Sequence, residues 1–161
     1  MKAGRSLKWV VLFGACVLAA IALVIVVKGW GFGRKPTLGD PSRGAGLYAE
    51  NCASCHGANL EGQPNWRSPG EDGVLPAPPH DRTGHTWHHG DGMLFDYTKL
   101  GGAETLKRTG VTGVNSGMPG FGDSLSDQGI WDILAFIKAS WPQRERELQQ
   151  QRTLAERMKG N

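Results

Sequence analysis

One short segment, Cys52-Ala53-Ser54-Cys55-His56, dominates the interpretation of this sequence. Two thiols separated by two residues lie about one turn apart on a helix, so both can react with the same ligand. His56 follows the second thiol directly and brings an imidazole nitrogen to the same side. The 161-residue chain holds three cysteines in all, which are too few for a disulfide scaffold. The segment therefore predicts ligand chemistry at Cys52, Cys55 and His56.

The spacing Cys-x-x-Cys-His is the attachment signature of c-type haem. Cys52 and Cys55 would each form a thioether bond to one of the two haem vinyl groups, and His56 would ligate the iron. The second ring nitrogen of His56 should donate to a carbonyl, which fixes the tautomer and the ring plane. The proline-rich stretch Leu75–Pro79 can supply that carbonyl.

Three other interpretations of the cysteine pair are open at this point, and the simplest is that Cys-x-x-Cys-His occurs by chance in a protein without haem. A redox pair of thioredoxin type needs a βαβ context, whereas the surrounding sequence is rich in helices and loops. A zinc site is the third alternative, because two thiolates and two imidazoles are suitable ligands. Its imidazoles would come from two of four histidines: His80, His85, His88 and His89. What favours haem over these alternatives is the remainder of the pattern.

A haem iron held by one histidine needs a sixth ligand or keeps an open position. Met118 and Pro119 lie in the glycine-rich loop 117–122, and a thioether is a soft, neutral donor that raises the reduction potential. Pro119 stiffens the loop, and the glycines let its backbone pass close to the macrocycle. Met93 is the rival, but it begins a predicted amphipathic helix and is more simply a packing residue. We therefore predict Met118 as the distal ligand.

The first helix is predicted to lead into the Cys-x-x-Cys-His segment. Asp40 is suited to cap a helix that starts at residue 41 and runs to about residue 54. Gly44 and Tyr48 lie four residues apart, on one face of it. Residues 57–89 contain too many glycines and prolines for a long element, and no apolar alternation is long enough to predict a sheet.

Three more helices are expected further along the chain. Asp91 can cap the second, which stops at residues 101–102, and the third covers about residues 103–110. Ser126 caps the last helix, which is expected to end at Pro142. Its apolar stripe has the strongest periodicity in the chain: Ile130, Ile133, Leu134, Ile137 and Trp141.

Residues 9–27 form an uncharged run that is expected to cross a membrane. A helix of 19 residues spans about 29 Å, close to the thickness of the hydrocarbon layer. A cleaved signal peptide would have a shorter apolar core that ends in a small-x-small site, and none is present. Cys16 raises the alternative of a lipoprotein, but its approach sequence is poor. We predict an uncleaved anchor over 1–28, followed by an interfacial linker over 29–39.

The remaining sequence divides into a compact domain, residues 40–142, and a polar tail, residues 143–161. The tail is rich in glutamine and alternating charges, and its Leu148, Leu154 and Met158 make no continuous apolar seam. It could prolong the last helix past Pro142 or stay disordered. A solvated tail is favoured over a helix that docks on a partner.

Together these motifs resemble a membrane-anchored monohaem class I cytochrome c. The resemblance covers about residues 40–142 and rests on the Cys-x-x-Cys-His segment, the Met-Pro loop and the first and last helices. It implies an all-α fold: a small class I cytochrome c-like helical domain with long loops around one covalent haem c, preceded by one N-terminal transmembrane helix. The first and last helices should cross near Gly44 and Phe136.

The resemblance also implies roles for particular side chains. Cys52 and Cys55 would carry the haem thioethers, with His56 as the proximal and Met118 as the distal iron ligand. Four further residues are candidates for supporting the haem or its ligands: Tyr48, Pro78, Pro79 and Phe121. The histidine-rich stretch 80–89 departs from the minimal family pattern and permits a second, metal-binding role.

A haem iron with both axial positions filled exchanges single electrons with little rearrangement of its ligands. We therefore expect an electron carrier, not an enzyme, in a respiratory or related redox chain. The alternatives are a haem subunit of a larger redox enzyme, an open sixth site with peroxidase-like or sensor chemistry, and periplasmic metal binding by the histidine-rich stretch. No P-loop, Rossmann or nucleophile-elbow motif offers another catalytic site.

Charge is unevenly distributed along the chain, although the formal net charge is only +3. Residues 1–35 hold six basic and no acidic side chains, whereas residues 40–142 hold 7 basic and 12 acidic ones. We expect a bacterial inner-membrane protein with a single span and a periplasmic haem domain, bound to lipid through its anchor. Its redox partners, such as a quinol-oxidising complex or a terminal oxidase, should present basic docking surfaces. No nucleic-acid partner is expected.

Overall fold

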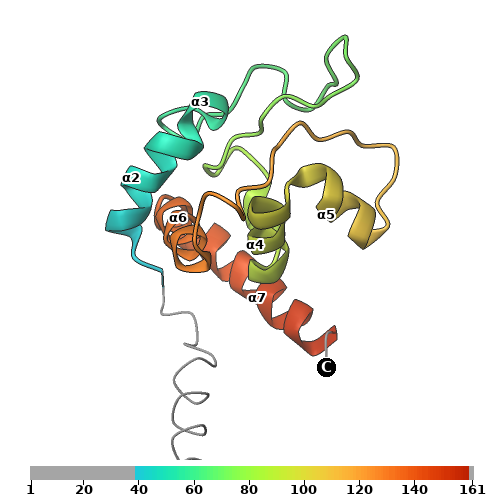
Figure 1. The fold of residues 1–161 in the computed structure, drawn as a ribbon. Coiled ribbons are helices and arrows are strands. Elements are labelled where there is room, and N and C mark those ends of the chain that lie inside the picture. Colours follow the sequence, from blue (N-terminus) through green and yellow to red (C-terminus); the bar gives the residue numbers. More distant parts are fainter. Residues whose placement is uncertain (1–38, 160–161) are drawn as a thin grey trace, which may run out of the picture. The chain divides into compact units, whose positions relative to one another are not determined.

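The computed structural model of the protein describes residues 39–159 (Figure 1). The predicted anchor, residues 1–28, lies outside the described residues, as does all but residue 39 of the linker. Within residues 39–159, none of the helices has the length and apolar character needed to span a bilayer. The described part is helical, and it contains one isolated parallel bridge, between Leu75 and Ser116, in place of any strand.

Helix α2 (Pro41–Asn51) begins as predicted. The Asp40 carboxylate caps it by accepting from the backbone N–H groups of Ser42 and Arg43. The helix ends earlier than predicted, because Cys52 is its C-cap, with φ widened to −118°, and a separate one-turn helix, α3 (Ala53–His56), follows. Each thiol of the motif therefore belongs to a different backbone environment.

Helix α6 (Asp127–Ala139) carries the core. Ser126 caps it, as predicted, by accepting from the N–H of Gly129 at 3.1 Å. The helix ends three residues before Pro142, so Trp141 lies beyond its last turn. Trp141 is nevertheless 1 % exposed as part of the hydrophobic core, and its indole N–H donates to the carbonyl of His80 at 2.6 Å. The buried stripe of the helix is the predicted one: Ile130, Ile133, Leu134 and Ile137.

Helices α2 and α6 cross where the resemblance to class I cytochromes c implies, beside Gly44. A Cβ atom at Gly44 would overlap the backbone carbonyl of Asp132 and approach the Cβ of Phe136 at 2.9 Å. The absence of a side chain therefore lets the two backbones touch. Next to the crossing, the Tyr48 and Phe136 rings pack with their centroids 5.3 Å apart.

Helix α4 (Asp91–Leu100) starts one residue earlier than the capping prediction requires. Its N-cap is Gly90, and Asp91 is already helical, so the prediction that Asp91 caps this helix is wrong. The Asp91 carboxylate instead accepts from Lys138 on α6 at 2.7 Å. Helix α5 (Gly102–Thr109) follows and ends at Gly110, in the left-handed region at φ 71°.

Two long loops lie on the side of the domain where α3 stands in Figure 1. One leaves α3 and reaches α4 through the single 3-10 turn η1 (Thr86–His88). The other joins α5 to α6 and contains Met118. They meet where the N–H of Leu75 donates to the carbonyl of Asn115 at 3.1 Å. The prediction of long loops over residues 57–89 is thus confirmed, apart from one short turn.

The C-terminal segment corrects the sequence prediction. Residues Gln143–Lys159 form helix α7, which contacts η1 and α4 rather than standing in solvent (Figure 1). The solvated-tail prediction is wrong because the docked face is polar. Its buried residues repeat every four positions, while Leu154 and Met158 are 50 % and 75 % exposed. The buried row is Glu145, Gln149 and Thr153.

Candidate functional site

The Cys-x-x-Cys-His segment is folded by hydrogen bonds to a single carbonyl. The N–H groups of Cys55 and His56 both donate to the Cys52 carbonyl, at 3.1 and 2.9 Å. Cys52 is buried and Cys55 is exposed. Burial raises the pKa of the Cys52 thiol to about 11, so before haem attachment this thiol is protonated at neutral pH.

His56 is held as the sequence predicts. Its ring is 6 % exposed, and Nδ1 lies 2.9 Å from the carbonyl oxygen of Pro78. A carbonyl only accepts hydrogen bonds, so Nδ1 carries the proton. Burial lowers the pKa of His56, partly offset by this hydrogen bond, and the imidazole is neutral. Its Nε2 lone pair is therefore the one that faces a ligand.

The Pro78 carbonyl is positioned by the loop that follows α3. The N–H of Gly62 donates to the His56 carbonyl at 2.7 Å, and that of Gln63 to the Ala77 carbonyl at 2.8 Å. Gly62 sits at φ 68°, and a Cβ there would come within 2.8 Å of the Pro79 ring. Only glycine at position 62 lets the two chain segments of this loop pass so closely.

The other predicted supporting residues lie near His56 or the Met118 loop. The Tyr48 hydroxyl donates to the Gly57 carbonyl at 2.9 Å, which ties α2 to the end of α3. Pro79 is buried, and its carbonyl accepts from the Thr86 hydroxyl at 3.5 Å. Phe121 packs against the core just beyond Met118.

His80 has a position that sequence analysis did not foresee. Its ring stacks on the His56 ring, with centroids 4.0 Å apart and an interplanar angle of 23°. Nδ1 of His80 is paired with the Thr86 hydroxyl at 2.9 Å, and burial lowers its pKa well below the ordinary value. The sequence signal for this position is that His80 directly follows Pro79, at the end of the proline-rich stretch that binds His56. A neutral, fixed ring therefore limits rotation of His56.

The Met118 loop is anchored to the end of α4. The N–H groups of Phe121 and Gly122 donate to the carbonyls of Thr98 and Lys99, at 3.0 and 2.9 Å. These carbonyls belong to the last turn of α4. The carbonyls of a helix's last turn have no hydrogen-bond partners within the helix. The Met118 carbonyl in turn accepts from the N–H of Gly102 at 2.9 Å. The backbone on both sides of Met118 is thereby tied to the α4–α5 junction.

Glycines make this anchoring possible. Gly101 lies at φ 87°, and a Cβ there would come within 2.7 Å of the Gly120 nitrogen. A Cβ at Gly120 would come within 2.7 Å of the Leu100 carbonyl carbon. Sequence analysis predicted that the loop glycines let the backbone pass close to the macrocycle. In the described residues, Gly120 and Gly101 let two backbone segments lie close to each other.

Met93 is placed at the opposite end of α4. It lies in the first turn, seven residues before Leu100, which corresponds to about 10 Å along the axis. Its side chain is half-buried and its N–H is bound by Glu156 of α7 at 2.8 Å. The structure therefore separates the two candidate methionines, and only Met118 lies in the loop anchored at the α4–α5 junction.

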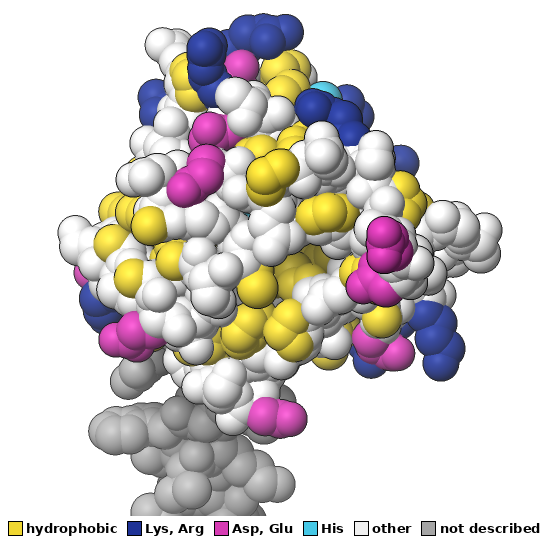
Figure 2. Space-filling model, turned by 90° about the horizontal axis from the view of Figure 1, so that it is seen from above, with side chains coloured by type: hydrophobic (Ala, Val, Ile, Leu, Met, Phe, Trp, Pro, Cys, Tyr) yellow, Lys and Arg dark blue, Asp and Glu magenta, His cyan; other side chains and the backbone are white. Residues whose placement is uncertain are grey.

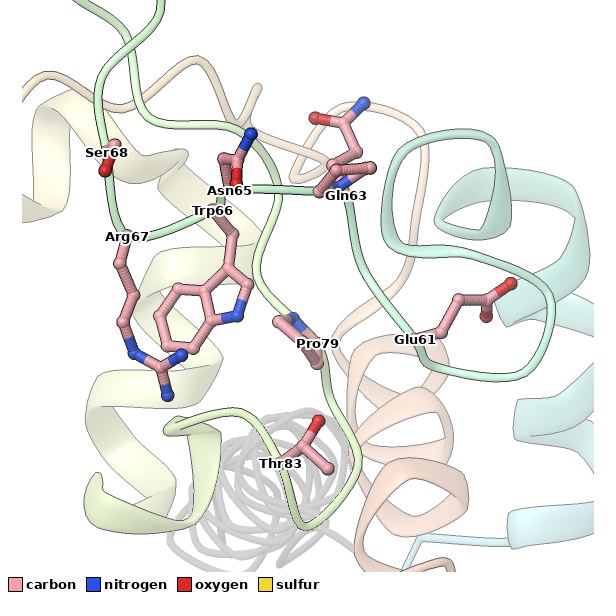
Figure 3. Close-up of a pocket in the computed structure, with 9 residues that line it drawn as sticks. Glu61, Gln63, Asn65, Trp66, Arg67, Ser68, Pro79 and Thr83 are labelled. Atoms are coloured by element: carbon pink, nitrogen blue, oxygen red, sulfur yellow. The ribbon is translucent and has the colours of Figure 1, made fainter.

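The histidine-rich stretch uses its rings for stacking. His85 stacks on Trp66 at 5.3 Å between centroids, and His88 stacks on Trp87 at 3.7 Å. Trp66 also carries the Arg67 guanidinium 4.0 Å from its ring centre, beside a shallow concavity of about 450 Å³ (Figure 3). Among residues 39–159, the side chains of His, Cys, Asp and Glu form no cluster of three suited to a metal ion.

The donor set fits a covalently held haem. Two thiols one turn apart, an imidazole with a free Nε2 and a thioether in an anchored loop are the groups that such a cofactor needs. Figure 2 views the domain from the side on which α3 lies in Figure 1. Hydrophobic side chains gather there in a central hollow, the surface expected against an apolar macrocycle.

Comparisons with known proteins agree with this geometry. Residues 41–141 match the family described as Cytochrome c, so the chain belongs to the cytochrome c family. The chain is also 28 % identical over 123 residues to cytochrome c6 of Picosynechococcus sp. (strain ATCC 27264 / PCC 7002 / PR-6), covering 74 % of this chain and 90 % of that protein. No solved structure matches.

Membership of this family means that the protein is a class I monohaem cytochrome c with covalently bound haem c. It is a haem-based electron carrier, as predicted, and its helical fold is that of the class. The matched region ends at residue 141, so helix α7 lies beyond it.

Proposed function

We propose that the protein is a membrane-tethered periplasmic electron carrier of a respiratory or related redox chain. Cys52 and Cys55 would form the thioethers, and His56 and Met118 would hold the iron. When bound, haem c supplies one-electron exchange between ferric and ferrous iron. With His56 and Met118 both holding the iron, no position would remain for peroxide or oxygen, so the chain would act as a carrier and not as an enzyme.

The observation that carries the proposal is the 2.9 Å pairing of His56 Nδ1 with the Pro78 carbonyl. It leaves Nε2 as the only ring atom with a free lone pair, on a residue that directly follows two thiols. The stacked His80 ring and the buried surroundings keep this imidazole neutral and oriented. The chain by itself therefore holds His56 in the protonation state and orientation that an iron ligand needs.

An absorption spectrum tests the cofactor assignment. Haem attached through Cys52 and Cys55 should remain with the chain after denaturation and acidic solvent extraction, and Cys52→Ala together with Cys55→Ala should abolish that retention. Haem that extracts freely from the native sequence would overturn the assignment.

The distal ligand is tested with two methionine variants. The oxidised protein should show the weak long-wavelength sulfur-to-iron band, which Met118→Ala should remove and Met93→Ala should leave unchanged. Persistence of the band in Met118→Ala, with loss in Met93→Ala, would show that the wrong methionine was assigned. Rapid carbon monoxide binding to the untreated reduced protein would show that the sixth position is open.

The location of the protein follows from the apolar run before the domain. Residues 9–27 are uncharged and long enough to cross a bilayer once, which supports a single span. A tether confines a carrier to the membrane plane and raises its effective concentration near membrane redox complexes. Membrane fractionation with protease digestion of intact spheroplasts tests this: the haem domain should pellet with membranes and be digested from outside.

Charge suggests the kind of redox partner. Residues 40–142 carry an excess of five acidic side chains, before any haem propionates are added. Partners such as a quinol-oxidising complex or a terminal oxidase should therefore dock through basic surfaces, and the association rate should fall as salt rises. An electron-transfer rate that stays flat between low and physiological ionic strength would contradict this part of the proposal.

A further inference from the structure

Helix α4 has no capping side chain of its own. Its N-cap is Gly90, so the N–H groups of the first turn cannot be bound by the residue that normally does so. All of the first three N–H groups are nevertheless taken, by side chains of α7. The N–H of Asp91 donates to the Thr153 hydroxyl at 3.1 Å, and those of Gly92 and Met93 donate to the two Glu156 carboxylate oxygens at 2.9 and 2.8 Å.

The glycines before and within this turn make room for the carboxylate. A Cβ at Gly90 would overlap Glu156 Oε2, and one at Gly92 would come within 3.1 Å of the same carboxylate. A negative charge at a helix N-terminus is also favoured by the helix dipole. The segment 90–92 is therefore shaped to receive a cap from a distant part of the chain.

Neighbouring contacts hold α7 in register with α4. The Gln149 amide donates to the Asp91 carboxylate at 2.7 Å and to the Thr153 hydroxyl at 3.1 Å. Gln149 and Thr153 are 2 % and 6 % exposed, so these hydrogen bonds form away from water. Buried polar contacts of this kind are costly to leave unpaired, and they specify one docking position for α7.

The opposite end of α4 holds the Met118 loop. The carbonyls of Thr98 and Lys99 accept from the N–H groups of Phe121 and Gly122, as described above. Helix α4 has only ten residues, and a helix of that length is marginal without contacts at its sides and ends. Without the cap from α7, fraying that starts at the first turn of α4 would therefore release the Met118 loop, which is bonded to the last turn.

We propose that Glu156 is a positioning residue for the distal ligand: it caps α4 from α7 and thereby keeps the Met118 loop closed. The inference rests on the proposed role of Met118. It concerns a helix that lies beyond the region matched to the family, so it assigns a task to the part of the chain that a minimal cytochrome c domain lacks.

The experiment measures loop opening in the intact haem protein. Added imidazole can bind the ferric iron only when Met118 has left it, so its apparent affinity reports the fraction of open loops. Loss of a cap weakens the first turn by an amount that corresponds to about a tenfold change in opening. Glu156→Ala should therefore bind imidazole about tenfold more tightly, and Glu156→Gln, which keeps one acceptor oxygen, should fall between it and the native protein.

Glu147→Ala is the matched control. Glu147 lies on the same helix and is exposed, and its carboxylate accepts from the Gln143 amide. Its replacement should leave imidazole affinity unchanged. Gly90→Ala is a second route to the same disruption, because the added methyl group displaces the Glu156 carboxylate while the sequence of α7 stays unchanged. It should also strengthen imidazole binding.

Amide hydrogen exchange distinguishes loss of the cap on α4 from opening of the Met118 loop. In Glu156→Ala, the amides of Gly92 and Met93 should exchange about tenfold faster, and those of Phe121 and Gly122 should follow. Faster exchange at residues 92–93 with unchanged imidazole affinity would overturn the coupling between the two ends of α4. Unchanged exchange at residues 92–93 would overturn the cap itself. A sulfur-to-iron band that survives Met118→Ala would instead overturn the ligand assignment beneath the inference.

Discussion

Helices α6 and α7 follow one another in the chain, but they dock by different physics. Helix α6 buries an apolar stripe against α2, and Ile130 and Ile133 are 0 % and 1 % exposed. Helix α7 buries a row of polar side chains against α4 and η1, with its largest apolar side chains left in solvent. The apolar contact is non-directional and tolerant, whereas the polar one depends on each hydrogen bond being made.

The two docking modes also serve different parts of the molecule. The α2–α6 contact supports the proximal side, because α2 leads directly into Cys52 and His56. The α7–α4 contact supports the distal side through the loop that contains Met118. Changes to the first contact should therefore cost the most global stability, and changes to the second should cost less global stability but also loosen the Met118 loop. Three sets of variants test this difference.

The largest effect is expected at the α2–α6 crossing. Gly44→Ala places a methyl group on the Asp132 carbonyl and should lower the free energy of unfolding by about 3 kcal/mol, because two backbones must separate. Gly46→Ala is the matched control on the same helix: no atom lies within 4 Å of its Cβ. It should stabilise by about 0.5 to 1 kcal/mol through helix propensity.

Denaturant unfolding of the two glycine variants measures both effects. Opposite signs for Gly44→Ala and Gly46→Ala would confirm that steric contact, not flexibility, accounts for the glycine at the crossing. Equal destabilisation by both variants would contradict the crossing geometry.

An intermediate effect is expected from the polar seam of α7. Gln149→Ala leaves the Asp91 carboxylate and the His89 carbonyl without this partner in a site that is 2 % exposed, and it should cost about 2 kcal/mol. Gln150→Ala, one residue along on the exposed face, should change stability by less than about 0.5 kcal/mol. Chemical denaturation followed by circular dichroism gives both values. A cost at Gln150 equal to that at Gln149 would argue against a specific polar seam.

The smallest effect concerns a polar contact inside the apolar α2–α6 interface. Asp132 is 2 % exposed. Burial opposes its ionisation, but hydrogen bonds from Arg43, the Asp40 N–H and Gln128 outweigh it and hold the pKa of Asp132 below its ordinary value. Its contribution to stability is therefore present above the unfolded-state pKa of about 4 and is lost as pH falls through the lower folded-state pKa.

Asp132→Asn tests this pH dependence. The variant should lower the free energy of unfolding at pH 7 by about 1.5 kcal/mol, since an amide cannot replace the charged partner of Arg43. The difference from the native protein should shrink as pH falls through the folded-state pKa of Asp132, where the native carboxyl becomes neutral as well. A difference that stays constant down to pH 2 would show that the loss is steric and not electrostatic.

Much of the proximal side could be predicted from the residues alone. The Cys-x-x-Cys-His spacing, the Asp40 and Ser126 caps and the stripe on α6 are local patterns with one dominant interpretation. The sequence limits the carbonyl that binds His56 to the stretch Leu75–Pro79, and in the structure it is that of Pro78. Stacking of His80 on His56 was not predictable, because it depends on how the loop returns to α3.

The docking of the C-terminal helix, α7, could not be predicted from the sequence. Local patterns alone determined the haem motif, the candidate distal methionine and the apolar stripe of α6, because covalent spacing and hydrophobic periodicity are properties of neighbouring residues. Only the tertiary structure decided that α4 starts after Gly90 without a capping side chain of its own, that Glu156 supplies the cap, and that α7 is docked. The reason is that a polar row has no driving force until its partners, 58 to 64 residues away, are in place to accept and donate hydrogen bonds.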